Sequence, residues 1–330
     1  MKIKVMVNGL PGKMAAKVAE HVLESDDMEL APEALTGEDI EQETWEYKLP
    51  GSKVSVALHK PSVRDSKIQE FREIYSDFIS VDFTQPGAVN DNVDFYCRNR
   101  LPFVCGTTGG DRAALEKRVQ DSDIPAVIAP NMAKQIVALQ SLMEKYAAEN
   151  ENRFRLYRLS ITESHQKGKK DTSGTAKAMV KYFQQLGIDF DVEQIKKIRE
   201  PEEQLALGVP PQYLSGHGWH RYELGPSGDT SPLISLAVRL SDLLRDDKLF
   251  EGYAKDELNT GCCQLVDRRS YDGTVFFRLV HCGDGSIQIR HDVNGRDIYA
   301  GGTLDAIRFL EKRLDEKGKD YSMIDVLKGE

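Results

Sequence analysis

The sequence predicts an α/β protein in which an N-terminal Rossmann-like doubly wound parallel sheet precedes an α+β domain with a mixed sheet. Apolar strands alternate with helical patterns up to residue 131, which is typical of parallel strands joined by crossover helices. A glycine turn joins the first strand to the first helix, and later segments are longer, with hairpin-like turns. A chain of 330 residues also exceeds what one hydrophobic core usually fills.

The first domain is expected to span residues 1–131. Its predicted strands cover residues 3–7, 28–35, 78–83, 103–105 and 126–129, and its predicted helices cover residues 13–25, 63–76, 88–100 and 112–122. A polar insertion before Val63 is expected to carry a short edge strand over residues 54–58.

The second domain is expected to span residues 132–296 and to bind substrate, while a C-terminal helix within 297–330 completes the first. A long helix over 131–150 leads into it, and the last helix, over 304–317, follows Gly301-Gly302. Its other predicted elements are strands over 154–161, 274–282 and 286–291, and a helix over 176–186. Residues 200–232 are rich in proline and glycine and yield no assignment.

Composition narrows the class of partner. The chain is 40% hydrophobic and 29% charged, as soluble globular proteins are, and its net charge of -9 argues against nucleic acid or an anionic membrane as partner. No signal or transit segment is expected, and the five cysteines show no C-x-x-C spacing, so reduced, partly buried thiols are predicted. The expected location is the cytoplasm, or the plastid stroma if a transit peptide has been removed.

The glycine turn Asn8-Gly9-Leu10-Pro11-Gly12-Lys13-Met14 lies where nucleotide-binding folds carry G-x-G-x-x-G. The match is imperfect, and a simple strand-to-helix turn is the alternative. The second strand ends in Ala34-Leu35-Thr36-Gly37 without the acid that usually binds a ribose 2'-hydroxyl. That absence, with Lys13 on the turn, favours NADPH over NADH.

Two further strand ends supply Asp82-Phe83-Thr84 and Gly106-Thr107-Thr108. Both fall at the carboxyl edge of the predicted sheet, where open α/β folds bind ligands. Each is also compatible with an ordinary Asx or Ser/Thr turn. Three such loops on one edge favour a cleft.

The segment from Glu163 to Thr175 combines a proton carrier, cations and an anion cradle. His165 can exchange a proton near neutral pH, Lys167, Lys169 and Lys170 surround it with positive charge, and Ser173-Gly174-Thr175 opens a helix. The alternative is a Ser/Thr N-cap after a solvated basic loop. The adjacency of the two halves favours an anionic small molecule.

Four motifs together resemble dihydrodipicolinate reductases, more closely their plant-type branch, over residues 3 to about 310. They are Asp82-Phe83-Thr84-x-Pro86, Gly106-Thr107-Thr108-Gly109, Ala129-Pro130-Asn131-Met132 and Glu163-Ser-His-Gln...Lys169...Ser173-Gly174-Thr175. The resemblance implies reduction of a cyclic dicarboxylate imine by NADPH or NADH in the diaminopimelate route of lysine biosynthesis. It also implies that the domain of residues 132–296 serves substrate binding and oligomerisation, in a homodimer or homotetramer, and that no metal is bound.

Carried over by motif position, the resemblance assigns His165 as proton donor or acceptor and Lys169 as a second acid. The residues implied to bind substrate are Gln166, Ser173, Gly174, Thr175 and Thr108. The residues implied to bind the cofactor are Gly9, Leu10, Pro11, Gly12, Lys13, Met14, Thr36, Phe83, Thr84, Gly106, Thr107, Ala129, Asn131, Met132 and Arg296. Gln166 stands where many bacterial members have a second histidine, so its neutral side chain should hold a carboxylate more weakly.

Two other functions stay open at this point. An oxidoreductase of the semialdehyde dehydrogenase type would use a cysteine nucleophile, for which Cys105 is the candidate, although a buried strand cysteine fits the pattern as well. A non-catalytic nucleotide-binding protein would need neither His165 nor Lys169.

Overall fold

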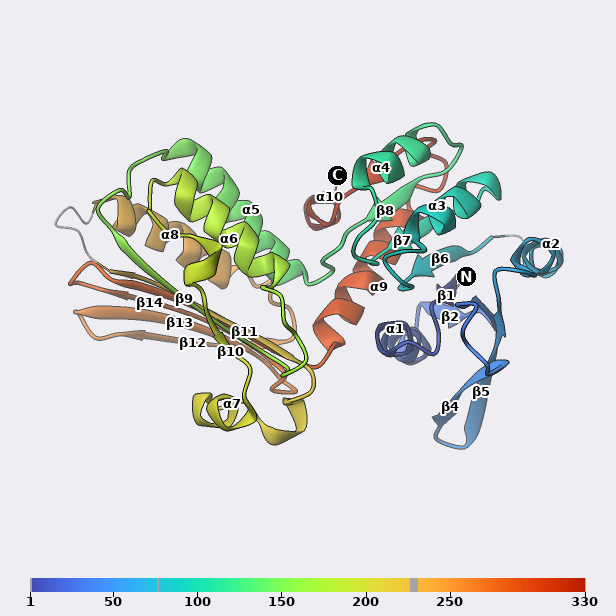
Figure 1. Ribbon diagram of the computed structural model, residues 1–330, viewed down its shortest axis with the longest axis horizontal. Helices are drawn as coiled ribbons and strands as arrows, with labels where there is room; N and C mark the ends of the chain where they lie inside the picture. The colour runs from blue at the N-terminus through green and yellow to red at the C-terminus, as the bar shows by residue number, and fades with distance from the viewer. Residues whose placement is uncertain (1, 76, 226–230, 330) are drawn as a thin grey trace. The chain divides into compact units, whose positions relative to one another are not determined.

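The computed structural model describes residues 2–75, 77–225 and 231–329 of the chain (Figure 1). It divides into two compact units, one of residues 1–134 with 299–330 and the other of residues 135–298. The predicted fold class is confirmed, because the first unit holds a parallel sheet with flanking helices and the second a mixed sheet.

The first unit is built on a six-stranded sheet in the order β16-β8-β7-β6-β1-β2, with every pair parallel. Its strands are β1 (Ile3–Asn8), β2 (Met28–Leu30), β6 (Ile79–Asp82), β7 (Phe103–Cys105), β8 (Ala126–Ile128) and β16 (Asp320–Tyr321). The connecting helices are α1 (Lys13–Glu24), α2 (Arg64–Ile74), α3 (Val89–Arg98) and α4 (Arg112–Gln120). All four predicted helices are present, and each ends one or two residues before its predicted end. Residue 76, the predicted end of the second, lies outside the described residues.

The strand predicted over residues 28–35 is wrong as a single element. The chain leaves the main sheet after β2, and β3 (Glu33–Leu35) pairs instead with β5 (Ser52–His59) and so with β4 (Thr44–Leu49) in a three-stranded sheet. Pro32 lies at the break, where its missing N–H cannot continue a ladder. The edge strand predicted over residues 54–58 is thus one arm of a full hairpin.

The last long helix starts earlier than the sequence indicates. It is α9 (Asp297–Glu311), so Gly301 and Gly302 lie inside it and do not precede it. A Cβ on Gly302 would come within 1.7 Å of the carbonyl oxygen of Met132, so close packing explains this glycine. A short helix, α10 (Met323–Lys328), follows β16.

The second unit is a seven-stranded sheet, β10-β9-β11-β15-β14-β13-β12, in which only the β10–β9 pair is parallel. Three helices cover one face of it: α5 (Lys134–Glu149), α6 (Gly174–Gln185) and α8 (Ser231–Arg245) (Figure 1). The strands are β9 (Arg158–His165), β10 (Lys196–Ile198), β11 (His217–Gly225), β12 (Tyr253–Asn259), β13 (Cys263–Ser270), β14 (Val275–Cys282) and β15 (Ile287–Asn294). Between β10 and β11 lies α7 (Pro201–Leu207), and residues 226–230 are outside the described residues.

The strand predicted over residues 154–161 is displaced. Phe154 is buried in a turn, where its amide donates to the carbonyl of Leu186 and its ring packs against Tyr146 and Tyr157. The true strand, β9, begins at Arg158 and ends at His165. His165 therefore lies on a strand, whereas the sequence placed it in a loop.

The prediction of reduced thiols is wrong for one pair. Cys263 and Cys282 face each other across β13 and β14, with Cα atoms 4.1 Å apart, and form a disulfide. The cross-strand register brings them together, and 19 residues of separation gave no motif to detect. Cys97 and Cys105 are free and buried, and Cys262 is free and exposed.

Candidate active site

Two positions in the turn after β1 leave no room for a side chain. Gly9 has φ +98°, and a Cβ there would come within 2.2 Å of the carbonyl oxygen of Phe83. A Cβ on Gly12 would come within 2.7 Å of the carbonyl oxygen of Gly9. Within the described chain no side chain caps α1 at Gly12, so the start of the helix has no side-chain acceptor of its own, an arrangement that suits a phosphate.

Asn8 holds this turn, and sequence reasoning gave it no role. Its fully buried side chain accepts a hydrogen bond from the amide of Leu35 at 2.9 Å and donates one to the hydroxyl of Tyr96 at 3.1 Å. Thr36 also makes a hydrogen bond within the protein, since its hydroxyl donates to the carbonyl of Leu10 at 2.6 Å. The side chain of Leu10 is buried, so only its backbone is available to a ligand.

Asp82 joins the neighbouring strand ends. Its buried carboxylate accepts hydrogen bonds from the hydroxyls of Thr84 at 2.8 Å, Thr107 at 2.5 Å and Tyr96 at 2.7 Å. Because β1, β6 and β7 are parallel, these groups share one edge of the sheet. The three loops predicted to gather there do so. Asp82 accepts hydrogen bonds from two of them, and Tyr96 links it to Asn8 at the glycine turn.

The remaining predicted cofactor residues of this unit follow β7 and β8. A Cβ on Gly106 would lie 2.3 Å from the ring of Phe83, so this glycine makes room for that ring. Thr108 is exposed. After β8, Ala129 and Met132 are buried, whereas the half-buried Asn131 accepts a hydrogen bond from the amide of Ala133 at 3.0 Å.

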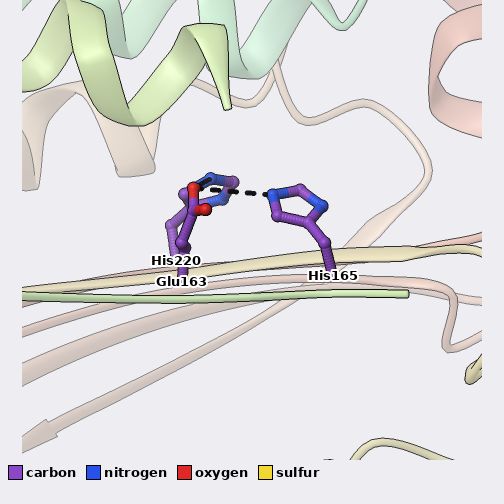
Figure 2. A group of neighbouring side chains, drawn as sticks. All are labelled: Glu163, His165 and His220. Atoms are coloured by element: carbon purple, nitrogen blue, oxygen red, sulfur yellow. Dashed lines mark ion pairs between the residues drawn. The ribbon is translucent and has the colours of Figure 1, made fainter. Parts of the chain in front are cut away.

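Three side chains of the second unit meet between the sheet and its covering helices, as Figure 2 shows. Glu163 and His165 project from one side of β9, and His220 lies on β11 directly opposite Glu163. One carboxylate oxygen of Glu163 lies 3.8 Å from Nε2 of each histidine. Sequence reasoning missed His220, because its register opposite Glu163 leaves no local pattern.

His165 has one ring nitrogen held by a hydrogen bond and one that is buried without a hydrogen-bond partner among the described residues. Its Nδ1 lies 3.1 Å from the carbonyl oxygen of His217, so Nδ1 carries the hydrogen and Nε2 keeps a lone pair in the neutral ring. Nε2 has no hydrogen-bond partner among the described residues. Burial, with added repulsion from Arg199 and Lys169, lowers the pKa of His165 to about 4 despite the attraction of Glu163. The ring is therefore neutral at pH 7, and Nε2 keeps its lone pair.

Gly218 makes room for this imidazole. It pairs with His165 across β9 and β11, and a Cβ there would lie 3.0 Å from Cε1 of the ring.

Glu163 is the buried anion of the cluster. Burial opposes its ionisation, but hydrogen bonds from Arg199 and from Ser173 outweigh burial, so the pKa of Glu163 is lowered. One oxygen accepts from the guanidinium of Arg199, and the other accepts from the amide of Ser173 at 3.1 Å. The carboxylate therefore stays charged and ties β9 to the start of α6.

Ser173 is the N-cap of α6, the arrangement that the sequence offered as the alternative to an anion cradle. Its hydroxyl accepts from the amide of Ala176 at 3.1 Å and lies 2.8 Å from Nε2 of His220. Gly174 is exposed, and a Cβ there would meet no described atom within 4 Å, so packing does not demand glycine. Thr175 is half-buried in the first turn of the helix.

The cations of the segment have different surroundings. Lys169 keeps 23% of its side-chain surface exposed and pairs with Asp171 at 2.9 Å, whereas Lys167 is 66% exposed and pairs with Glu200. Gln166 is half-buried. Arg296 follows β15 in this second unit, with its guanidinium close to Gly216, so it lies apart in the chain from the other predicted cofactor residues.

Glu163, His165 and His220 offer three ligand atoms within 4.8 Å of one another, a spacing that could hold a metal ion. The surrounding charge opposes this. Both oxygens of Glu163 already accept hydrogen bonds, one from a guanidinium, and Lys169 adds a second positive charge. These cations, with the exposed Gly174 in the first turn of α6, favour an anionic ligand beside neutral His165.

Comparisons with known proteins cover nearly the whole chain. Residues 3–132 match the family model "Dihydrodipicolinate reductase, N-terminus", and residues 136–327 match "Dihydrodipicolinate reductase, C-terminus". The chain is 36% identical to a probable 4-hydroxy-tetrahydrodipicolinate reductase 1, chloroplastic, from Oryza sativa subsp. japonica, across 98% of the chain and 78% of the relative. It is also 36% identical to 4-hydroxy-tetrahydrodipicolinate reductase 2, chloroplastic, from Arabidopsis thaliana, across 99% and 77%.

The fold has a relative among solved structures. A dipicolinate-bound dihydrodipicolinate reductase from Paenisporosarcina sp. TG-14 superposes with a TM-score of 0.53 at 17% identity, covering 98% of each chain.

Proposed function

The chain belongs to the dihydrodipicolinate reductase family, and we propose that its two units divide the work of the reaction. It is an oxidoreductase that reduces 4-hydroxy-tetrahydrodipicolinate in lysine biosynthesis. The observation that carries the assignment of roles is the neutral, unpartnered Nε2 of His165 beside cations and a capped helix start. The first unit holds the nucleotide, and the second holds the dicarboxylate.

The cofactor is a pyridine nucleotide, and the strand-end edge of the first unit fits it. Close backbone approach at Gly9 and Gly12 leaves the start of α1 open for a pyrophosphate. When bound, the dihydronicotinamide supplies a hydride to the substrate. The preferred cofactor is NADPH, because Lys13 is exposed on this turn and the buried strand end at Thr36 offers no carboxylate to a ribose. The cofactor residues inferred from the sequence remain proposals.

The substrate lies against the start of α6. One carboxylate meets the N–H groups of Gly174 and Thr175, the Ser173 hydroxyl and the Lys169 ammonium. The open space beside Gly174 is consistent with a ligand there. Gln166 and Thr108 make weaker contacts with the substrate in this proposal. Arg296 is reassigned to the substrate side, because it adjoins the Gly216 loop that leads to β11.

His165 and Lys169 share the proton chemistry. Reduction of a conjugated imine places negative charge on the substrate, and the Lys169 ammonium stabilises that charge. Two substrate carboxylates beside His165 raise its pKa from about 4, so that Nε2 takes up a proton as substrate binds. Nε2 then delivers this proton to the reduced substrate.

The semialdehyde dehydrogenase alternative is opposed by chemistry at Cys105. Its thiol is buried at the end of β7, and burial, reinforced by the charge of Asp82, raises its pKa far above the ordinary thiol value. A thiol in that state is a poor nucleophile. The non-catalytic alternative leaves the His165 arrangement without purpose.

The active species is proposed to be a homodimer or homotetramer joined through the sheet of the second unit. The side chain of Leu258 on β12 is 56% exposed, which is consistent with a covered surface in an assembly. No helix among the described residues is long and apolar enough to cross a bilayer. The proposed location is the cytoplasm or, following the names of the plant relatives, the plastid stroma.

The test is a coupled assay. The product of a dihydrodipicolinate synthase is supplied with NADPH or NADH, and cofactor oxidation is followed. We expect oxidation with both and a lower KM for NADPH. Absence of oxidation with either cofactor would remove the function, and a lower KM for NADH would remove the cofactor preference alone.

A further inference from the structure

We propose that Asp82 is a positioning residue for cofactor recognition: its carboxylate takes the hydroxyl protons of Thr84 and Thr107, so that both hydroxyls can only accept hydrogen bonds, and they receive the N–H groups of the nicotinamide carboxamide. The inference rests on the proposed function, since it assumes a pyridine nucleotide on the first unit. The motif that begins at Asp82 assigned cofactor contacts to Phe83 and Thr84 but gave Asp82 itself no role.

The proton of the Thr84 hydroxyl has its direction fixed by Asn92. A hydroxyl has one proton to donate and two lone pairs with which to accept. The guanidinium of Arg64 is only a donor, and it donates to the side-chain oxygen of Asn92 at 3.1 Å, so the other end of the Asn92 amide carries its N–H groups. These N–H groups donate to the Thr84 hydroxyl at 3.0 Å and to Oδ2 of Asp82 at 3.0 Å. The Thr84 hydroxyl therefore gives its own proton to Oδ1 of Asp82, at 2.8 Å.

The proton of the Thr107 hydroxyl is fixed by the backbone. The amide of Thr84 donates to the Thr107 hydroxyl at 2.9 Å. Both acceptors that the Thr107 proton can reach belong to Asp82, namely Oδ1 at 2.5 Å and the carbonyl oxygen at 3.3 Å. Each threonine hydroxyl has thus donated once and accepted once, and within the part of the chain that the structure describes it keeps one lone pair.

The carboxylate of Asp82 is fully occupied and does not meet the ligand itself. It is fully buried, and its Oδ2 also accepts from the Tyr96 hydroxyl at 2.7 Å. The Tyr96 oxygen accepts in turn from the side-chain N–H groups of Asn8, whose oxygen accepts from the amide of Leu35. Donors with no alternative direction therefore surround both oxygens of Asp82, and the carboxylate acts on a ligand only through the two threonines.

The place of these hydroxyls on the sheet identifies the part of the cofactor that reaches them. In the sheet order, β2 lies on one side of β1, whereas β6 and then β7 lie on the other. A pyrophosphate at the start of α1 follows β1, and the ribose next to the adenine lies at the end of the second strand in such folds. The nicotinamide half therefore extends toward the ends of β6 and β7, where Thr84 and Thr107 are half-buried.

Two lone pairs select among the groups that could lie at this edge. A primary carboxamide carries two N–H donors, which match the two acceptors. A carboxylate has acceptors only, and it would face the lone pairs of both hydroxyls without a donor. The pair of threonines therefore favours a nicotinamide over a substrate carboxylate, and over the acid form of the same cofactor.

The experiment uses nucleotides that differ in one substituent of the pyridine ring. NADP⁺ carries the carboxamide, its acetylpyridine analogue keeps the carbonyl but has a methyl group in place of the amide nitrogen, and its nicotinic acid analogue has a carboxylate. Dissociation constants are measured by calorimetry on the full-length parent, Thr84→Val, Thr107→Val, their double variant and Asp82→Ala. Thr107→Ser keeps the hydroxyl, and Thr303→Val removes a fully buried hydroxyl of α9 that donates to the carbonyl of Tyr299, so these two are controls.

We expect the parent to bind the acetylpyridine analogue about tenfold more weakly than NADP⁺, the loss expected for two hydrogen bonds between neutral groups, and the acid analogue about a hundredfold more weakly. Each single valine variant should weaken NADP⁺ about three- to fivefold and leave the acetylpyridine analogue unchanged, so the two should bind about equally to the double variant. Thr107→Ser and Thr303→Val should keep the difference seen in the parent. Asp82→Ala frees both hydroxyl protons, so the acid analogue should gain about tenfold relative to NADP⁺.

Equal weakening of NADP⁺ and the acetylpyridine analogue by the valine variants would overturn the inference, because a purely structural role of the hydroxyls affects both nucleotides alike. A parent that does not distinguish the two would overturn it as well. If Asp82→Ala does not fold, the acid analogue on the valine variants decides: unchanged affinity supports the inference, and a loss would show that the hydroxyls donate to the ligand. A parent that neither turns over nor binds any of these nucleotides would contradict the proposed function itself, whereas an active parent without the carboxamide preference would contradict only this inference.

Discussion

Glu163 and Arg199 form an ion pair in which the carboxylate is fully buried and the guanidinium keeps only 14% of its side-chain surface exposed. The same guanidinium donates to the carbonyl of Lys169 at 2.8 Å. The pair therefore joins β9, the end of β10 and the lysine-rich segment that leads to α6. It gives the site its shape as well as its charge.

The variant Glu163→Gln should lower the free energy of unfolding by about 3 kcal/mol at pH 7, because it leaves Arg199 nearly buried without its counter-charge. Urea unfolding measures the change. Lys167→Gln is the control, since its pair with Glu200 is exposed on both sides and should contribute nothing measurable. Equal effects from the two variants would contradict a structural role for the buried pair.

Acid should weaken the second unit through its buried histidines. Burial lowers the pKa of His165 to about 4 and that of His291 to about 3, below their value of about 6.5 in the unfolded chain. Between pH 6.5 and 4 the unfolded chain binds the protons that the folded chain excludes, so stability falls as pH falls. At pH 5 each of these histidines should cost about 2 kcal/mol relative to pH 7 and above.

The measurement is the free energy of urea unfolding at pH 7, 6 and 5. His291→Phe should flatten the pH dependence, because it removes one buried titrating ring without breaking a hydrogen bond. Tyr222→Phe alters the same core but removes no group that titrates in this range, so it should keep the full slope. A slope unchanged in His291→Phe would show that this ring does not titrate as described.

Local pattern predicted those parts of the site that depend on neighbours in sequence. The loops around Gly9, Phe83 and Gly106 were expected at one edge because parallel strands leave their carboxyl ends together, and an N-cap was one of the two interpretations of Ser173. Lys169 was also predicted to lie near His165, although its repulsion lowers the pKa of His165 less than burial does.

The parts that failed depend on register between distant segments. His220 meets Glu163 only through the pairing of β9 with β11, and Cys263 meets Cys282 only through that of β13 with β14. Asn8 was assigned to the glycine turn without a role of its own, because its partner Tyr96 is 88 residues away. The pattern of apolar and polar residues along one strand does not predict which residue of another strand will lie opposite.

Gly301 and Gly302 show how a local rule misled, and they give a matched pair of variants. Glycine usually marks a helix boundary, yet both lie inside α9. Gly302→Ala should destabilise the first unit by several kcal/mol, on the scale of overpacking, because its Cβ would overlap the carbonyl oxygen of Met132. Gly301→Ala meets no described atom within 4 Å and should stabilise the helix by up to about 1 kcal/mol. Thermal unfolding should move in opposite directions for the two, and a common direction would contradict the packing explanation.

The proposed NADPH preference depends on Lys13 at the start of α1. Lys13→Gln should raise the KM for NADPH about five- to tenfold and leave the KM for NADH unchanged, since one charge-assisted contact to the 2'-phosphate is lost. Lys17→Gln is the control, because Lys17 lies one turn along the same helix and pairs with Glu20 at 2.8 Å. Equal losses with both nucleotides would place Lys13 against the pyrophosphate shared by the two cofactors.

His165→Gln should lower kcat about 10²- to 10³-fold, within the usual contribution of a positioned acid, while NADPH binding persists. Glutamine keeps a polar side chain of similar reach but cannot carry the proton. NADPH fluorescence titration checks binding, and His281→Gln on β14 tests whether loss of another histidine of the unit has any such effect. Unchanged turnover in His165→Gln would remove the proposed proton donor.

The neutral state of free His165 gives this prediction a second readout. Its pKa of about 4 means that the free protein carries no proton there at pH 6 to 7, so a donor role requires proton uptake when the dicarboxylate binds. Calorimetric titration with pyridine-2,6-dicarboxylate in buffers of different ionisation enthalpy measures that uptake directly. We expect an uptake that falls as pH rises above the bound-state pKa and that is abolished in His165→Gln. Binding without uptake at any pH between 5 and 7 would instead leave Lys169, or water, as the source of the proton.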